Sequence, residues 1–326
     1  MCSSDLNYWG TKPSLKNVLI QHVPEEAARI LALRRGDADL AEVTERGALP
    51  ALRSDPKVTV LDGLSGIHVP VLFFNQRITP GLTGDLRPDF FADINVRRAV
   101  NYLMDDARYT KEVTLGSAEP RSMALPTGFL GYNPSAPNYG FSLDKAAAAF
   151  RAAFGGQLWT TGFTLPLYYA AGSDHDQTVL EMLKANIKRI NPKFRVTVQS
   201  KPYSELLTDA KDGKLALGLA SWGPDYADPD NVMYTLYASD GYYAPRTHVN
   251  DAQIDTWLNA ARVSVNPTER KALYGKVAAR AHELALYVIM PAEPNYITFR
   301  SNLGGLTKAT FSPLLGGNVY WRQLKK

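Results

Sequence analysis

The chain has 326 residues, a length typical of about two domains. Its composition is 45% hydrophobic and 21% charged, close to that of ordinary globular proteins, which argues against a disordered, collagenous or coiled-coil chain. The net charge of +4 is spread without long single-sign runs, so neither a nucleic-acid-binding stripe nor a polybasic membrane patch is predicted. Cys2 is the only cysteine, which excludes an internal disulfide and a cysteine-based zinc cluster.

The first quarter of the chain predicts one sheet-bearing unit. The apolar run at 18–20 predicts a strand, and Pro24 with the two glutamates after it predicts a helix that ends at Gly36. Two further strands are predicted at 58–61 and 67–74. The second is so continuously apolar that both of its faces should be buried.

A polar segment rich in breakers, residues 75–81, predicts a crossing between lobes. After it, apolar residues at helical spacing predict a helix over 95–105. The Pro/Gly-rich stretch 120–140 predicts a loop, and an alanine-rich helix follows from Ser142 to a Gly-Gly stop at 155–156.

From residue 163 strands and helices alternate with short links, a pattern typical of a parallel sheet built from right-handed crossovers. The predicted strands are 163–169, 194–198 and 215–221, and the predicted helices are 176–190 and 203–211. Ligands in such sheets gather beyond the carboxyl ends of the strands.

Two more helices are predicted, one from Ala252 and one opened by Asn266-Pro267. A last strand at 287–290 stops at the proline-rich segment 291–294, which predicts a second crossing before a short tail.

A scan for catalytic motifs finds none. The Gly-x-Ser-x-Gly turn of acyl-transfer enzymes and the glycine-rich dinucleotide and P-loop motifs are all missing from the sequence. The five histidines are dispersed, so no catalytic residue, cofactor or metal site is expected. No apolar run approaches the roughly 18 residues of a membrane span, and no signal peptide is recognisable at the start.

One segment stands out, the stretch Ser221–Asp230, which directly follows the predicted strand 215–221 at its carboxyl end. Trp222 offers a flat apolar wall and Asp225 a negative charge, which together suit a ligand with an ammonium group. Aspartate and proline also favour turns for local reasons, so turn chemistry is the alternative. Asp225 and Asp228 as the carboxylate pair of a glycoside hydrolase is a further alternative.

Several motifs together resemble the oligopeptide and dipeptide type of solute-binding protein (family 5) that serves ABC importers. They are Asn7-Tyr8-Trp9 followed by Pro13, the run 95–102, the run Trp222–Pro229, the run 250–255 and the helix 270–283. The resemblance covers nearly everything after Leu6.

This resemblance implies an α/β periplasmic-binding-protein fold (type II) with mixed, largely parallel sheets, whose two lobes close on a ligand without catalysis. Residues 7–75 and 293–326 are then expected to form an incomplete first lobe, and 76–292 the second lobe. Residues 1–6 match nothing in the family and read as a non-family leader. Members of the family also carry a signal sequence and further segments upstream, so we expect an N-terminally truncated chain whose strands over 17–75 have unpaired edges.

The resemblance also assigns ligand-binding residues. Asp225 matches an aspartate that pairs with a peptide's α-ammonium, and Trp222 and Ser221 match positions that line the pocket. Tyr203 stands where the family has a pocket tryptophan. The alternative is that Tyr203 is only a packing residue at the start of a helix. Dipeptide-selective relatives place an arginine after the strand that ends near Tyr169, also expected at the pocket, and this sequence has none there.

We therefore predict the substrate-binding component of an ABC importer for peptides, with a non-peptide solute (a nickel chelate, a sugar or an opine) as the alternative. Its partners would be the ligand and the permease subunits of the transporter, not nucleic acid. The complete protein is expected to be a monomer located in the periplasm or on the cell surface as a lipoprotein.

Overall fold

The computed structural model describes residues 9–314 and 319–326, and the expected leader at 1–6 lies outside them. Contacts divide the chain into two compact units. Unit 1 comprises Met1–Gly66 and Pro294–Lys326, and unit 2 comprises Ile67–Glu293. The chain therefore crosses between the units twice.

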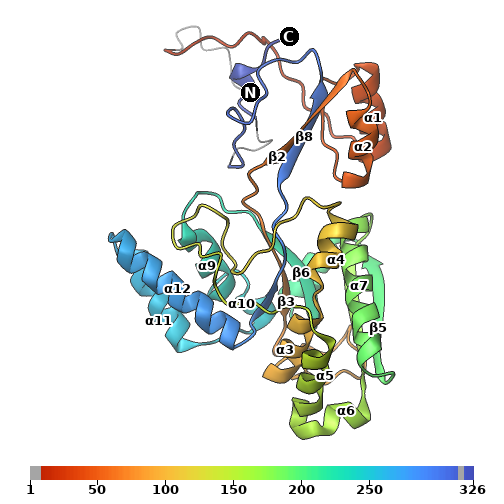
Figure 1. Ribbon diagram of the computed structural model, residues 1–326, viewed down its shortest axis with the longest axis vertical. Helices are drawn as coiled ribbons and strands as arrows, with labels where there is room; N and C mark the ends of the chain where they lie inside the picture. The colour runs from red at the N-terminus through yellow and green to blue at the C-terminus, as the bar shows by residue number, and fades with distance from the viewer. Residues whose placement is uncertain (1–8, 315–318) are drawn as a thin grey trace. The chain divides into compact units, whose positions relative to one another are not determined.

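Unit 1 is built on a three-stranded antiparallel sheet in the order β1-β8-β2 (Figure 1). Its strands are β1 (Leu40–Ala41), β8 (Asn295–Arg300) and β2 (Val58–Leu64), and its helices are α1 (Glu26–Arg35) and α2 (Leu49–Arg53). A short 3₁₀ turn, Arg46–Ala48, precedes α2. The central strand β8 comes from the C-terminal tail, where the sequence predicted no strand.

Helix α1 ends where the sequence predicted, because Gly36 adopts the left-handed conformation (φ 90°) that closes a helix. The strand predicted at 18–20 is wrong. Residues 18–20 form no strand, and Leu19 and Ile20 are 81% and 78% exposed, because no neighbouring strand of the described chain pairs with them.

Unit 2 contains an antiparallel sheet in the order β6-β3-β7, formed by β6 (Leu217–Trp222), β3 (Val69–Phe74) and β7 (Tyr287–Ile289). A separate parallel pair joins β4 (Phe163–Ala170) to β5 (Phe194–Lys201). The parallel crossover predicted for these two strands is confirmed. The expectation of largely parallel sheets is wrong for this chain, since β6 pairs antiparallel with β3 rather than extending the parallel pair.

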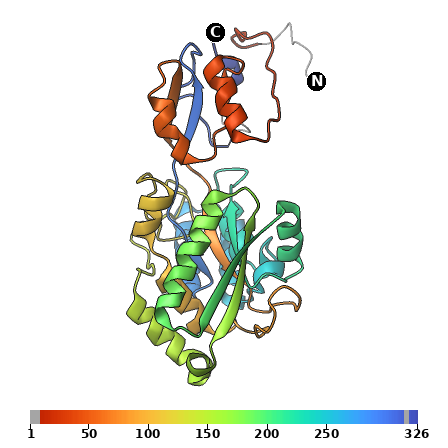
Figure 2. The same cartoon turned by 90° about the vertical axis from the view of Figure 1, so that its right-hand side faces the viewer.

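The helices of unit 2 cover both faces of the β3 sheet. One hydrophobic core contains Leu72 and Phe74 of β3, and the other contains Val69 and Val71. Helix α7 packs along β5, and α11 and α12 form a hairpin beside α9 (Figures 1 and 2). The helices are α3 (Ile94–Leu103), α4 (Asp106–Arg108), α5 (Leu143–Ala152), α6 (Gln157–Thr161), α7 (Asp174–Ile190), α8 (Tyr203–Lys211), α9 (Pro229–Tyr237), α10 (Ala244–Thr247), α11 (Ala252–Val263) and α12 (Pro267–Glu283).

The unit boundaries lie at 66/67 and 293/294, whereas the sequence placed them near 75 and 292. The first difference has a simple cause. Strand β3 is the central strand of the unit 2 sheet, hydrogen-bonded to β6 on one side and β7 on the other, so it cannot belong to unit 1.

Candidate functional site

The end of β6 fixes the position of the segment singled out in the sequence. Ser221 and Trp222 pair with Pro70 and Val69 at the start of β3. The chain then turns through residues 223–227 and enters α9, where the Asp228 side chain caps the helix by accepting a hydrogen bond from the Asp230 N–H. A short loop between a strand end and a capped helix is therefore held at both ends.

Trp222 lies in a cluster of aromatic side chains. Its ring centroid is 5.3 Å from that of Tyr242 and 6.4 Å from that of Tyr243, and the Arg246 guanidinium stacks 4.2 Å above the Tyr242 ring. Burial raises the pKa of Tyr243 to about 12, so this ring stays neutral. Tyr242 is the exposed ring of this cluster, Trp222 is half-buried, and Tyr243 and Arg246 are buried beneath them.

Asn231, in the first turn of α9, joins Trp222 to Asp225. Its side-chain oxygen accepts a hydrogen bond from the Trp222 indole N–H at 2.9 Å and from the Asp225 backbone N–H at 3.4 Å. The Asp225 carboxylate is exposed and forms no ion pair with any described residue. Asp225 therefore presents a negative charge on a positioned backbone.

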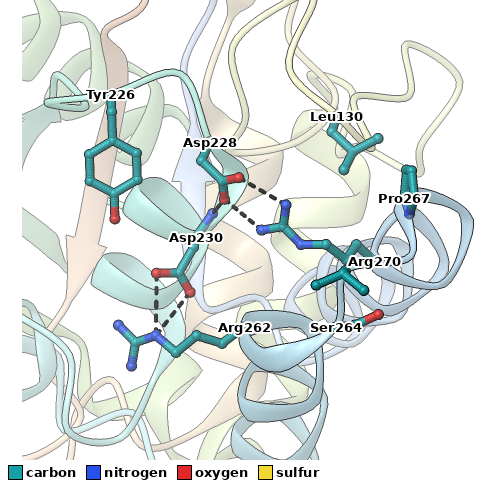
Figure 3. Close-up of a pocket in the computed structure, with 9 residues that line it drawn as sticks. Leu130, Tyr226, Asp228, Asp230, Arg262, Ser264, Pro267 and Arg270 are labelled. Carbon is teal, nitrogen blue, oxygen red and sulfur yellow. Dashed lines mark hydrogen bonds and ion pairs between the residues drawn. The ribbon is translucent and has the colours of Figure 1, made fainter.

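The two neighbouring aspartates, Asp228 and Asp230, form ion pairs with arginines. Asp228 accepts a bidentate pair of hydrogen bonds from Arg270, at 2.9 and 2.7 Å, and Arg262 Nε lies 3.3 Å from each carboxylate oxygen of Asp230 (Figure 3). These pairs line a pocket of about 440 Å³ between the loop and the α11–α12 hairpin. Both aspartates thus hold the loop against the helices.

The hydrolase alternative needs one of Asp225 and Asp228 to act as a general acid. Hydrogen bonds from Arg270 lower the pKa of Asp228, whereas a general acid needs a raised pKa. The structure therefore gives Asp228 a structural role in the turn, as the turn reading expected for this residue.

The other predicted ligand-binding residues lie at different places in unit 2. Ser221 is exposed, and its hydroxyl lies 3.5 Å from Nδ1 of His68, the residue that precedes β3. Tyr203 opens α8 and is 66% exposed, near enough for its charge to influence the pKa of Tyr243. Tyr169, near the end of β4, is half-buried against the first core, and no described contact joins it to Trp222.

Sequence reasoning missed Asn231, His68 and Arg246. The position of Asn231 was recognisable, because a residue in the first turn of a capped helix lies beside the loop that enters the helix. His68 and Arg246 come near Trp222 only through the pairing of β6 with β3 and the packing of α10, which no local pattern reveals.

A second polar cluster lies at the end of unit 2. His175 on α7 contacts Asp176 at 3.0 Å through Nδ1 and Glu293 at 3.1 Å through Nε2, and the buried Tyr109 hydroxyl donates to Glu293. Burial opposes protonation of His175, but the hydrogen bonds that its ring donates to the Asp176 and Glu293 carboxylates together outweigh burial and raise its pKa to about 9. His175 is therefore a cation at neutral pH.

Over the residues that the structure describes, no helix is both long and apolar enough to span a membrane. In the same residues, no group of three or more His, Cys, Asp or Glu side chains is arranged to hold a metal ion.

Comparison with known proteins decides the family. The profile of the bacterial extracellular solute-binding proteins, family 5, matches residues 5–244. The chain belongs to this family.

Two curated relatives and one solved structure illustrate the range of the family. Heme-binding protein A of Haemophilus influenzae is 25% identical over 307 residues, covering 94% of this chain and 54% of that protein. Di/tripeptide-binding protein 2 of Pseudomonas aeruginosa is 26% identical over 311 residues, covering 94% and 55%. The periplasmic binding protein DppA of Helicobacter pylori, solved with the peptide STSA, matches with a TM-score of 0.81 at 22% identity, covering 98% and 59%.

The solved structure shows that this family 5 chain has the periplasmic-binding-protein fold. The chain spans about half the length of the curated relatives it matches.

Proposed function

We propose that this family 5 chain is the substrate-binding component of an ABC importer and that it binds peptides. The observation that carries the proposal is the contrast among three aspartates between the end of β6 and the first turn of α9. Asp228 and Asp230 are neutralised by arginines, whereas the exposed Asp225 has no ion-pair partner among the described residues and stands beside the Trp222 surface.

An exposed carboxylate beside aromatic rings suits a peptide amino terminus. The carboxylate accepts charge-assisted hydrogen bonds from the ammonium group, and the rings cover the adjoining side chain. Hydrogen bonds to a charged group contribute roughly 1.5 to 3 kcal/mol. A contact with Asp225 would therefore raise the affinity for a peptide with a free amino terminus by about tenfold or more. Ser221, Tyr203 and Tyr169 are proposed as further walls of the site.

The proposal includes the organisation of the protein. Unit 1 would be part of the first lobe of a periplasmic binding protein and unit 2 the second lobe. The protein would work in the periplasm or at the cell surface, deliver its ligand to the permease subunits and catalyse no reaction.

Isothermal titration calorimetry tests the peptide-binding proposal. The protein, expressed from its full coding sequence, is titrated with tetra-alanine and with N-acetylated tetra-alanine. We expect the free peptide to bind at least tenfold more tightly, and Asp225→Asn to remove that preference. An unchanged preference in Asp225→Asn would show that another group receives the ammonium.

A non-peptide solute is the second candidate, and the heme-binding relative favours it. Native mass spectrometry of the protein as purified identifies the bound molecule directly. A co-purified peptide supports the main proposal, and a non-peptide solute together with no calorimetric signal for peptides replaces it.

A further inference from the structure

Arg121 is a buried cation with no acidic ion-pair partner among the described residues. Its side chain is 2% exposed, and no described carboxylate pairs with it. Of its three nitrogens, Nη1 donates to the His68 carbonyl at 2.8 Å, Nε is buried without a partner, and Nη2 has no hydrogen bond within the described part of the chain. Desolvation lowers the pKa of Arg121 to about 10, yet it remains charged at neutral pH.

A second buried arginine shows what a purely structural role looks like. Arg97 is 4% exposed and also lacks a hydrogen-bonded carboxylate, but all three of its nitrogens donate to backbone carbonyls, those of Leu284, Phe91 and Ala92. An unsatisfied buried donor destabilises the folded protein, and more so when it carries charge. Arg97 avoids that cost, and Arg121 does not.

Nε and Nη2 form one edge of the Arg121 guanidinium, and neither has a hydrogen-bond partner among the described residues. Elsewhere in this chain the same edge binds a carboxylate, since Arg87 holds both oxygens of Asp89 through Nε at 2.6 Å and Nη2 at 2.8 Å. This side-on arrangement is a preferred geometry for arginine and a carboxylate. Arg121 therefore has the donor edge for such a pair, and no described carboxylate occupies it.

Hydrogen bonds place Arg121 near the candidate site. Its Nη1 bond holds it to His68, whose ring lies beside the Ser221 hydroxyl at the carboxyl end of β6. Its backbone is held by a hydrogen bond from the Asn138 side chain to the Arg121 carbonyl, and Glu119 forms a β-bridge with Ala292 just beyond β7. Arg121 is thus fixed at the end of the sheet that carries Trp222.

We propose that Arg121 binds a carboxylate group of the ligand through its Nε–Nη2 edge. The proposal rests on the proposed function and deepens it, because it makes the ligand class a molecule with a free carboxylate. With Asp225 as the ammonium contact, unit 2 would then recognise both charges of a zwitterionic peptide. The cation that the sequence lacks after Tyr169 would come from the loop at 120–140 instead.

Two pairs of probes test the proposal. The first pair is tetra-alanine as the free acid and as the C-terminal amide, compared by calorimetry. The wild-type protein should bind the free acid at least tenfold more tightly, Arg121→Gln should bind both alike, and Arg121→Lys should keep part of the difference. Retention of the full difference in Arg121→Gln would overturn the proposal.

The second pair of probes tests carboxylate binding without a peptide. Thermal unfolding is followed in sodium succinate and in sodium chloride of the same ionic strength. Succinate should raise the Tm of the wild-type protein and leave that of Arg121→Gln unchanged. If peptides fail to bind but succinate acts through Arg121, only the peptide-binding proposal falls. If succinate has no effect on the wild-type protein, or if sodium phosphate acts and succinate does not, the carboxylate assignment is wrong.

Arg97→Gln is the matched control, since it removes an equally buried guanidinium. It should lower stability while keeping the succinate response. Arg98→Gln, which removes an exposed guanidinium that donates to the Glu283 carbonyl, serves the same purpose should Arg97→Gln not fold. A loss of the response in Arg98→Gln would show that the effect is not specific to Arg121.

Discussion

The Asn231 side-chain oxygen accepts the Trp222 indole N–H at 2.9 Å, and this bond ties the end of β6 to the first turn of α9. The same oxygen accepts the Asp225 backbone N–H, so one side chain sets the position of both proposed ligand contacts.

Replacing Asn231 with leucine should therefore affect binding more than folding. The change keeps the size of the side chain but removes the acceptor, and a lost neutral hydrogen bond costs roughly 1 kcal/mol. We expect a small loss of stability in urea and a loss of peptide affinity on the order of tenfold, checked by calorimetry and by tryptophan fluorescence. Asn231→Asp keeps an acceptor and should retain the tryptophan signal. Equal affinity in Asn231→Leu and wild type would rule out a positioning role.

Asp228 should matter for stability, since it both caps α9 and pairs with Arg270. Asp228→Asn keeps a capping oxygen and loses the ion pair, at a cost of about 0.5 to 1 kcal/mol for a partly exposed pair. Asp228→Ala loses the cap as well, which adds about 1 kcal/mol. Urea unfolding measures both differences, and equal stabilities of the two variants would contradict the capping role.

The pH dependence of the Asp228 variant has a defined sign. The Arg270 hydrogen bonds lower the pKa of Asp228 in the folded protein, so the stabilisation is present above the unfolded-state pKa of about 3.9. It is lost as the pH falls through the lower folded-state pKa. The difference in stability between wild type and Asp228→Asn should be constant near neutral pH and should shrink only in strong acid.

His175 predicts the opposite pH dependence. Its folded-state pKa of about 9 lies above the ordinary value of 6.5, so its contacts with Asp176 and Glu293 stabilise the protein fully below pH 6.5. That contribution disappears as the pH rises through about 9. Because the side chain is 32% exposed, we expect His175→Gln to cost only about 1 kcal/mol at neutral pH. Thermal unfolding from pH 5 to 10 should show the two proteins converging at the alkaline end, and a constant gap would contradict this assignment.

Two glycines of the β6 region form a matched test of packing. A Cβ on Gly223 would lie 2.6 Å from the His68 ring, which is exposed and can rotate away. A Cβ on Gly218 would lie 2.4 Å from the ring of Phe73, which is buried in the second core. We expect Gly223→Ala to lower peptide affinity with less than 1 kcal/mol of destabilisation, and Gly218→Ala to destabilise by about 1 to 3 kcal/mol. The reverse order of stabilities would contradict the described packing.

Local signals were enough to predict most elements of unit 2. Ser142 accepts the Lys145 N–H at the start of α5, and β3 is buried along nearly its whole length, both as expected. Elements that depend on distant partners were predicted less well. The tail strand β8 was missed because its partners, β1 and β2, lie more than 200 residues earlier in the chain.

The residues of the candidate site also differ in whether a local sequence pattern could predict them. Trp222 and Asp225 belong to one short segment after a predicted strand, so the sequence alone could single them out. Arg121 could not be found, because its unsatisfied edge is defined by what is missing around it in three dimensions. Its contact with the His68 carbonyl joins residues 53 positions apart.

The central strand of unit 1 has a consequence for biosynthesis. Strand β8 lies between β1 and β2 and pairs with both, yet it is translated only after all of unit 2. During synthesis the pairing of β8 with β1 and β2 must wait until residues 295–300 emerge, whereas the described strand pairings of unit 2 all lie earlier in the chain. The described pairings of unit 2 can therefore form before β8 joins the sheet of unit 1.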